Sequence, residues 1–140
     1  MIDHCPPQIT QDHLNKGARV YVRQSTSRQV RNYPGSTEYQ RDQKIYALRW
    51  GWREDQIEFY EDLGLSGSSA DRREGFQRLL ADIHEGKVGA VFCTDVARLT
   101  RTPRTFETLV CLCRHHRTLL AIDGQVFDLN DPVDRLLVLV

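Results

Sequence analysis

Hydroxyl and arginine side chains gather in three short segments of this 140-residue chain. The segments are residues 23–27 (Arg-Gln-Ser-Thr-Ser), residues 71–73 (Asp-Arg-Arg) and residues 95–101, which include Arg98 and Arg101. Arginine presents a rigid fork of donors that matches the oxygens of a phosphate, and several arginines together stabilise the negative charge of a phosphoryl transition state. A hydroxyl beside them is placed to attack phosphorus, and Ser25, Thr26 and Ser27 are the candidates. The three segments therefore predict a site for a phosphate ester.

Short apolar segments alternate with segments of helical periodicity along the chain. The predicted strands are residues 18–24, 57–61, 89–95 and 118–123. The predicted helices run from Thr37 to about Gly51, through Phe76 to Gly86, and from about Pro103 through Cys113. This order predicts an α/β fold with a mainly parallel central sheet and helices on both of its faces, with ligands bound at the carboxyl ends of the strands.

The three polar segments occupy the places where such a sheet binds ligands. Residues 23–27 end the first predicted strand, residues 95–101 follow the third, and residues 71–73 end the loop before the second helix. The carboxyl ends of parallel strands meet at one edge of the sheet, so we expect these segments to converge there.

The charges are balanced in total but unevenly distributed. The chain has 19 Lys plus Arg and 19 Asp plus Glu, so its formal net charge is zero. Residues 13–37 contain no acid but include Lys16, Arg19, Arg23, Arg28 and Arg31, and Arg98, Arg101 and Arg104 form a second basic stretch. The acids lie chiefly in residues 54–62 and 123–134. If the fold brings the basic stretches together, the protein presents one positive face to a polyanion.

Composition and cysteine spacing exclude several classes of protein. The apolar fraction of 40% is that of a globular domain, and no apolar run approaches the roughly 18 residues of a membrane span. The N-terminus lacks the features of a signal peptide, so we expect a cytoplasmic protein. The four cysteines form no CxxC pair. Cys111 and His115 make at most half of a zinc site, and we expect Cys93 and Cys113 to be buried apolar residues.

Five segments in order resemble the catalytic domain of the serine site-specific recombinases, the resolvase and invertase family that includes large phage integrases and transposon recombinases. They are the nucleophile motif Tyr21-Val22-Arg23-Gln24-Ser25-Thr26, the helix start at residues 36–40, the strand and loop at residues 60–67, the helix at residues 73–80 and the paired arginines Arg98-Leu99-Thr100-Arg101. The resemblance covers about residues 18–140.

The resemblance implies a set of catalytic roles and partners. Ser25 would attack a DNA phosphodiester and form a 5′-phosphoserine link, and the scissile phosphate would be held by Arg23, Arg73, Arg98 and Arg101, assisted by Gln40. No metal or other cofactor is implied. The partner is DNA, bound by a homodimer that assembles into a tetramer when two sites pair.

The same resemblance divides the chain into an N-terminal extension (residues 1–17), a catalytic domain (18–128) and the start of a dimerisation helix (129–140). The sequence ends just as that helix would begin. We therefore expect this chain alone to be monomeric or weakly associated and unable to select a recombination site.

Two positions leave alternatives open. Many family members have an aspartate where this chain has Ala97, and Asp95, two residues earlier on the predicted strand, is a possible substitute. Arg72 competes with Arg73 for a place in the phosphate clamp. The main alternative function is a catalytically inactive resolvase-like module that only assembles or binds DNA. A small phosphate-ester hydrolase ranks last, because the sequence has no acidic metal cluster and no cysteine nucleophile loop.

Overall fold

Five strands form one sheet in the computed structural model, which describes residues 5–24, 37–63, 74–100 and 102–139. The strands are β1 (Gly17–Gln24), β2 (Ile57–Leu63), β3 (Val88–Cys93), β4 (Leu119–Ile122) and β5 (Gln125–Phe127), in the spatial order β2-β1-β3-β4-β5. The first four run parallel and β5 runs antiparallel to β4. The predicted α/β fold with a mainly parallel sheet is confirmed.

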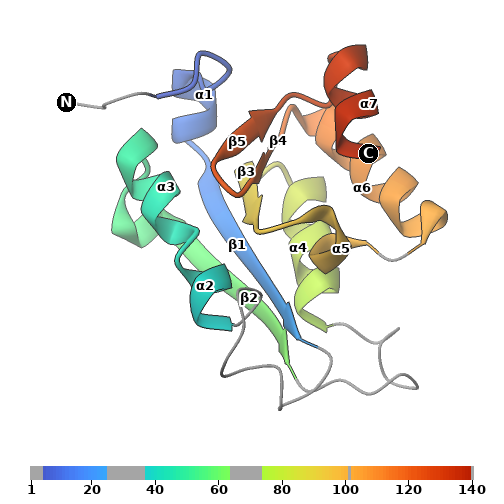
Figure 1. Ribbon diagram of the computed structural model, residues 1–140. Helices are drawn as coiled ribbons and strands as arrows, with labels where there is room; N and C mark the ends of the chain where they lie inside the picture. The colour runs from blue at the N-terminus through green and yellow to red at the C-terminus, as the bar shows by residue number, and fades with distance from the viewer. Residues whose placement is uncertain (1–4, 25–36, 64–73, 101, 140) are drawn as a thin grey trace.

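Helices cover both faces of this sheet (Figure 1). In chain order they are α1 (Gln11–Leu14), α2 (Thr37–Arg41), α3 (Lys44–Trp50), the 3₁₀ turn η2 (Glu54–Gln56), α4 (Glu74–His84), α5 (Val96–Leu99), α6 (Pro103–His116) and α7 (Pro132–Leu139). Tyr21 faces a core shared with α4, α6 and α7, whereas its neighbours Val20 and Val22 face a second core that contains Trp50 and Trp52. Successive residues of β1 therefore anchor opposite layers.

Two predicted elements differ from the structure. The predicted helix from Thr37 to Gly51 is two helices. Hydrogen bonds that span three residues, from Gln43 N to Gln40 O and from Tyr46 N to Gln43 O, interrupt the four-residue pattern of an α-helix. The predicted strand at residues 89–95 ends at Cys93, and Asp95 caps the short helix α5 instead.

The edge strand β5 was not predicted, although its turn carries a hairpin signal. Asp123 and Gly124 both have positive φ, at 46° and 87°. Two such residues in a row make the tight turn that returns an antiparallel strand, and Asp-Gly is a favoured pair there. The hairpin gives the parallel sheet one antiparallel edge.

The N-terminal segment before β1 packs onto the second core. Cys5, Ile9 and Leu14 contact that core. The ring of His13 links the segment to the end of α6, because Nε2 bonds to the Arg117 carbonyl at 3.0 Å and Nδ1 accepts from Thr10 N at 3.0 Å. Residues 5–16 are therefore part of the packed domain.

Candidate active site

Arg23 is fixed through its main chain at the carboxyl end of β1. The side chain of Gln40, on α2, accepts from Arg23 N at 2.9 Å and donates to Arg23 O at 3.2 Å. Gln40 is fully buried, so this amide pairing is shielded from water. Two of the predicted site residues thus come together, one on the sheet and the other on a helix beside it.

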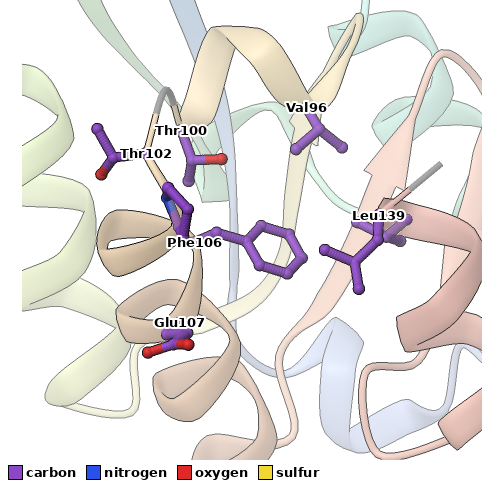
Figure 2. Close-up of a pocket in the computed structure, with 8 residues that line it drawn as sticks. Val96, Thr100, Thr102, Phe106, Glu107 and Leu139 are labelled. Atoms are coloured by element: carbon purple, nitrogen blue, oxygen red, sulfur yellow. The ribbon is translucent and has the colours of Figure 1, made fainter.

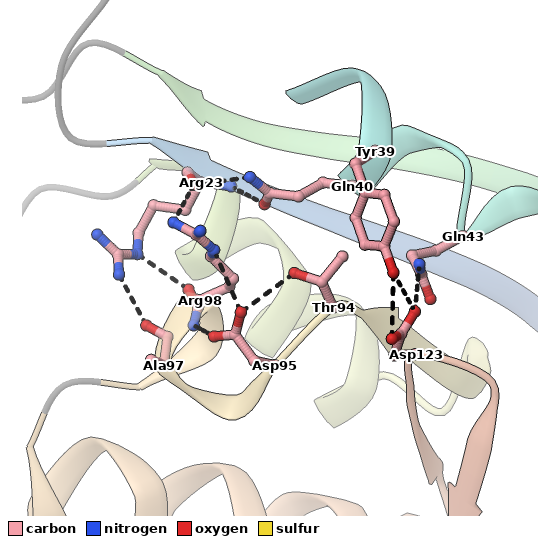
Figure 3. Close-up of polar contacts among 9 residues, drawn as sticks. All are labelled: Arg23, Tyr39, Gln40, Gln43, Thr94, Asp95, Ala97, Arg98 and Asp123. Atoms are coloured by element: carbon pink, nitrogen blue, oxygen red, sulfur yellow. Dashed lines mark hydrogen bonds and ion pairs between the residues drawn. The ribbon is translucent and has the colours of Figure 1, made fainter. Parts of the chain in front are cut away.

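The guanidinium of Arg23 extends across to α5 (Figure 3). Its Nη2 donates to the carbonyl of Ala97 at 2.7 Å and its Nε to that of Arg98 at 3.1 Å. In return, Nη1 of Arg98 donates to the carbonyl of Arg23 at 3.2 Å. The two arginines are therefore locked side by side, and the carbonyls that accept from the Arg23 guanidinium orient its positive charge without neutralising it.

Helix α5 owes its position to Asp95. The Asp95 carboxylate accepts from Arg98 N at 3.2 Å, as an N-cap does, and its Oδ2 lies 3.5 Å from Arg98 Nε. The prediction that Asp95 lies on a strand was wrong, because β3 ends at Cys93, so strand alternation does not place Asp95 on the same face as position 97. Asp95 instead reaches the guanidinium of Arg98. Ala97 contributes its carbonyl, which does not depend on the side chain at that position.

Asp62 is a site residue that the sequence reasoning missed. It is 6% exposed and pairs in register with Arg23 on the neighbouring strand. Its carboxylate accepts from the Tyr21 hydroxyl at 2.6 Å, from Gly75 N at 2.8 Å and from Phe76 N at 2.9 Å. Asp62 therefore caps the start of α4 from β2. The sequence feature that could have identified Asp62 is its place directly after the strand predicted at residues 57–61.

Three predicted site residues, Ser25, Arg73 and Arg101, lie outside the described residues. So do the rivals Thr26, Ser27 and Arg72. In sequence, Ser25 follows Gln24, the last residue of β1, and Arg73 precedes Glu74, the first residue of α4. Arg101 falls between α5 and the N-cap of α6. The described elements thus lead directly into each of these positions.

Two of the cations predicted to contribute to a positive face, Arg19 and Lys16, contact other parts of the described domain instead. Arg19 is buried and pairs with Glu58 at 3.0 Å and Asp82 at 3.1 Å. Lys16 donates to the carbonyl of His116 at the end of α6. These two cations therefore form structural contacts between elements of the domain. Among the described residues, the basic groups at the carboxyl end of β1 are Arg23 and Arg98.

Cysteines and other possible metal ligands are dispersed in the part of the chain that the structure describes. No three His, Cys, Asp or Glu side chains gather there as metal ligands would, and Cys111 is exposed. Cys93 and Cys113 are buried as predicted. Burial raises the pKa of Cys113 to about 12 and also raises that of Cys93.

Among residues 5–24, 37–63, 74–100 and 102–139, no helix is long and apolar enough to cross a membrane.

An apolar pocket of about 400 Å³ lies beside α5 (Figure 2). Its walls come from α5, the start of α6 and the end of α7, with Val96, Phe106, Val138 and Leu139 as the apolar lining. In Figure 2 the Phe106 ring points toward Leu139. The pocket joins the helix that carries Arg98 to the helix predicted to mediate dimerisation.

Comparisons with known proteins find chains similar to this one in sequence and in fold. A curated relative from Sinorhizobium fredii, the uncharacterized protein y4bA/y4pH, is 35% identical over 131 residues that make up 93% of this chain, which spans only 19% of the relative. The N-terminal catalytic domain of TP901-1 integrase superposes with a TM-score of 0.66 at 25% identity, over 89% of this chain and 90% of that one.

Two further structures share the fold. A resolvase family site-specific recombinase from Streptococcus pneumoniae has a TM-score of 0.63 at 27% identity, over 88% of this chain and 80% of that chain. The C-terminal catalytic domain of an IS607-like serine recombinase, ISC1926 TnpA, has a TM-score of 0.59 at 23% identity, over 87% and 74% of the two chains. The family model described as "Resolvase, N terminal domain" matches residues 18–140. The chain therefore belongs to the resolvase N-terminal domain family, the catalytic-domain family of the serine recombinases.

Proposed function

We propose that this protein cleaves and rejoins DNA strands with Ser25 as the nucleophile. The observation that carries the proposal is the locked group of Arg23, Gln40 and Arg98 at the end of β1, two residues before Ser25 in sequence. A serine hydroxyl needs activation, and adjacent guanidiniums favour its alkoxide. The same groups stabilise the pentacovalent phosphorus of the transition state.

Cleavage is a transesterification. The Ser25 oxygen loses its proton and bonds to phosphorus, while the bond from phosphorus to the 3′ oxygen breaks and that oxygen takes up a proton. The products are a 5′-phosphoserine link and a free 3′ hydroxyl. Because the phosphoserine ester retains the energy of the broken bond, attack by a 3′ hydroxyl reverses the reaction without ATP. In this scheme Arg73 and Arg101 complete the phosphate clamp.

We further propose that the protein acts as a homodimer that forms a tetramer when two DNA sites pair. Helix α7 supports this, because Val133, Leu136, Leu137 and Leu139 are each at least half exposed. Four large apolar side chains on one short helix are typical of a surface that another protein covers. The apolar pocket beside α5 lies next to this helix.

Covalent capture of DNA tests the proposal. The full-length protein is incubated with sheared and nicked chromosomal DNA from the source organism, because a nick beside the cleaved bond releases a short strand and traps the intermediate. The mixture is then denatured, and DNA that stays attached to protein is recovered and sequenced. We expect attachment to Ser25, identified by mass spectrometry as a nucleotide-modified peptide.

Three variants separate the outcomes. Ser25→Ala should abolish attachment, and Arg23→Ala and Arg98→Ala should lower its rate at least tenfold, since removal of one charge-stabilising donor costs about 10²–10³ in comparable sites. Attachment that persists in Ser25→Ala would overturn the assignment of the nucleophile. Absence of attachment in the intact protein would favour the inactive module instead.

A further inference from the structure

Three consecutive residues of α2 reach three different parts of the sheet. Tyr39 donates its hydroxyl to the Asp123 carboxylate in the β4–β5 turn, at 3.0 and 3.2 Å. Gln40 pairs with the main chain of Arg23 in β1. Arg41 makes a two-pronged contact with Glu61 in β2, at 2.7 and 2.8 Å. A helix of five residues is too short to be stable alone, so these contacts determine where α2 lies.

The middle contact connects the position of α2 to the candidate site. Gln40 can make both of its bonds only while its amide lies edge-on to the Arg23 peptide groups, and hydrogen bonds weaken steeply as this alignment is lost. The guanidinium of the same Arg23 is held by α5. A shift of α2 would therefore alter the main chain two residues before Ser25.

Asp123 is well placed to hold α2 through Tyr39 (Figure 3). Its φ of 46° is fixed by the tight turn, and its N–H donates to the carbonyl of Cys93 at 2.9 Å, which ties the turn to the end of β3. Besides Tyr39, its carboxylate accepts from Gln43 Nε2 at 3.3 Å. The Tyr39 side chain is 41% exposed, so apolar burial alone does not fix it. The hydrogen bond to Asp123 also raises the pKa of Tyr39.

We propose that Tyr39 and Asp123 form a positioning pair that holds α2, and through Gln40 the main chain of Arg23, in the arrangement needed for cleavage. The proposal rests on the proposed function. Neither residue touches the reacting atoms in this scheme. The pair makes the edge hairpin, which β3 separates from β1, part of the support of the site.

The test compares Tyr39→Phe with a matched control, Tyr60→Phe. The Tyr60 hydroxyl likewise donates to a carboxylate, that of Asp82 on α4. Each change removes one hydroxyl and keeps the ring. With the duplex recovered by covalent capture, we expect the attachment rate at saturating DNA to fall about three- to tenfold in Tyr39→Phe, the effect of one ordinary hydrogen bond lost from a partly exposed side chain. The DNA concentration for half-saturation should not change, and Tyr60→Phe should keep the intact rate.

A rescue variant and a spectrum distinguish positioning from a general loss of stability. Asp123→Asn keeps an acceptor oxygen and tolerates the left-handed turn, so it should retain most of the rate that Asp123→Ala loses. In protein labelled with ¹⁵N in glutamine and arginine, the Gln40 side-chain amide and the Arg23 backbone amide should shift in Tyr39→Phe and stay in place in Tyr60→Phe.

The outcomes separate this inference from the proposed function. Failure of the intact protein to attach DNA overturns the proposed function and the role of the pair with it. Normal attachment by the intact protein, together with an equal rate and unshifted amides in Tyr39→Phe, overturns the pair alone. Equal losses of rate in Tyr39→Phe and Tyr60→Phe overturn it too, because they indicate general destabilisation.

Discussion

Asp62→Asn is a nearly isosteric change that should weaken the start of α4. The carboxylate presents both oxygens to backbone donors, Oδ1 to Gly75 N and Oδ2 to Phe76 N, while Oδ2 also accepts the Tyr21 hydroxyl. An amide has only one acceptor oxygen. Its NH₂ group would therefore face at least one buried N–H, and that donor would be left without a partner.

The size of the effect follows from these contacts. A buried donor without a partner costs about 1–3 kcal/mol. The loss of a negative charge at a helix N-terminus adds about 0.3–1 kcal/mol. We therefore expect Asp62→Asn to lower the free energy of unfolding by about 2–3 kcal/mol. Tyr21→Phe removes one donor and keeps both backbone bonds, so its cost should be smaller, about 1–2 kcal/mol.

Urea denaturation followed by circular dichroism measures these differences. For a slope of about 1–3 kcal/mol per molar urea, the midpoint should fall by about 0.7–3 M in Asp62→Asn. Asp55→Asn is the matched control, because its side chain is 74% exposed and its ion pair with Arg53 contributes little. If the free energies of unfolding of Asp62→Asn and the intact protein agree within about 0.5 kcal/mol, the capping role of Asp62 is refuted.

Three further results are expected. Gly75→Ala should destabilise the protein in the same titration, because its Cβ would lie 3.1 Å from both Asp62 carboxylate oxygens. Alanine ordinarily favours a helix over glycine by about 1 kcal/mol, so a stabilised variant would contradict this prediction. Burial lowers the pKa of His13, so the unfolded chain binds more protons below about pH 6.5. The free energy of unfolding should therefore fall as the pH is lowered from about 7 to 5, and it should fall less steeply in His13→Gln. Equal pH dependence in the two proteins would contradict this role of His13. A thiol reagent should modify exposed Cys111 in the folded protein and buried Cys113 only after unfolding, as peptide mass spectrometry would report.

The sheet and its helical layers were predictable because each element carries its own local pattern. The alternation in β1 and the apolar stripe of α4 identify a strand and a helix without knowledge of any partner. Parallel order then follows from the strand–helix alternation. The convergence of Arg23 and Arg98 at one edge is a consequence of that topology, and the structure confirms it.

Apart from the β4–β5 hairpin, whose Asp123-Gly124 turn is a local signal, the features that were not predicted depend on partners distant in sequence. Gln40 and Gln43 direct their side chains to Arg23 and Asp123, and the helix is interrupted between them. Asp62 caps a helix from a neighbouring strand rather than from the residue before the helix, so no N-cap motif marks it. Local periodicity contains no information about such contacts.

The balanced charge of the chain is compatible with a phosphate site because the acids near it are engaged by donors of the protein itself. Asp62 accepts from the start of α4, Asp95 from the start of α5, and Asp123 from Tyr39 on α2. Helix N–H groups hold Asp62 and Asp95, and a side-chain hydroxyl holds Asp123, so much of the charge of each carboxylate is compensated locally. Each of these three helices also carries or adjoins a predicted site residue, since α4 follows Arg73, α5 contains Arg98 and α2 contains Gln40. The acids that make the net charge zero therefore include those that position the proposed phosphate clamp.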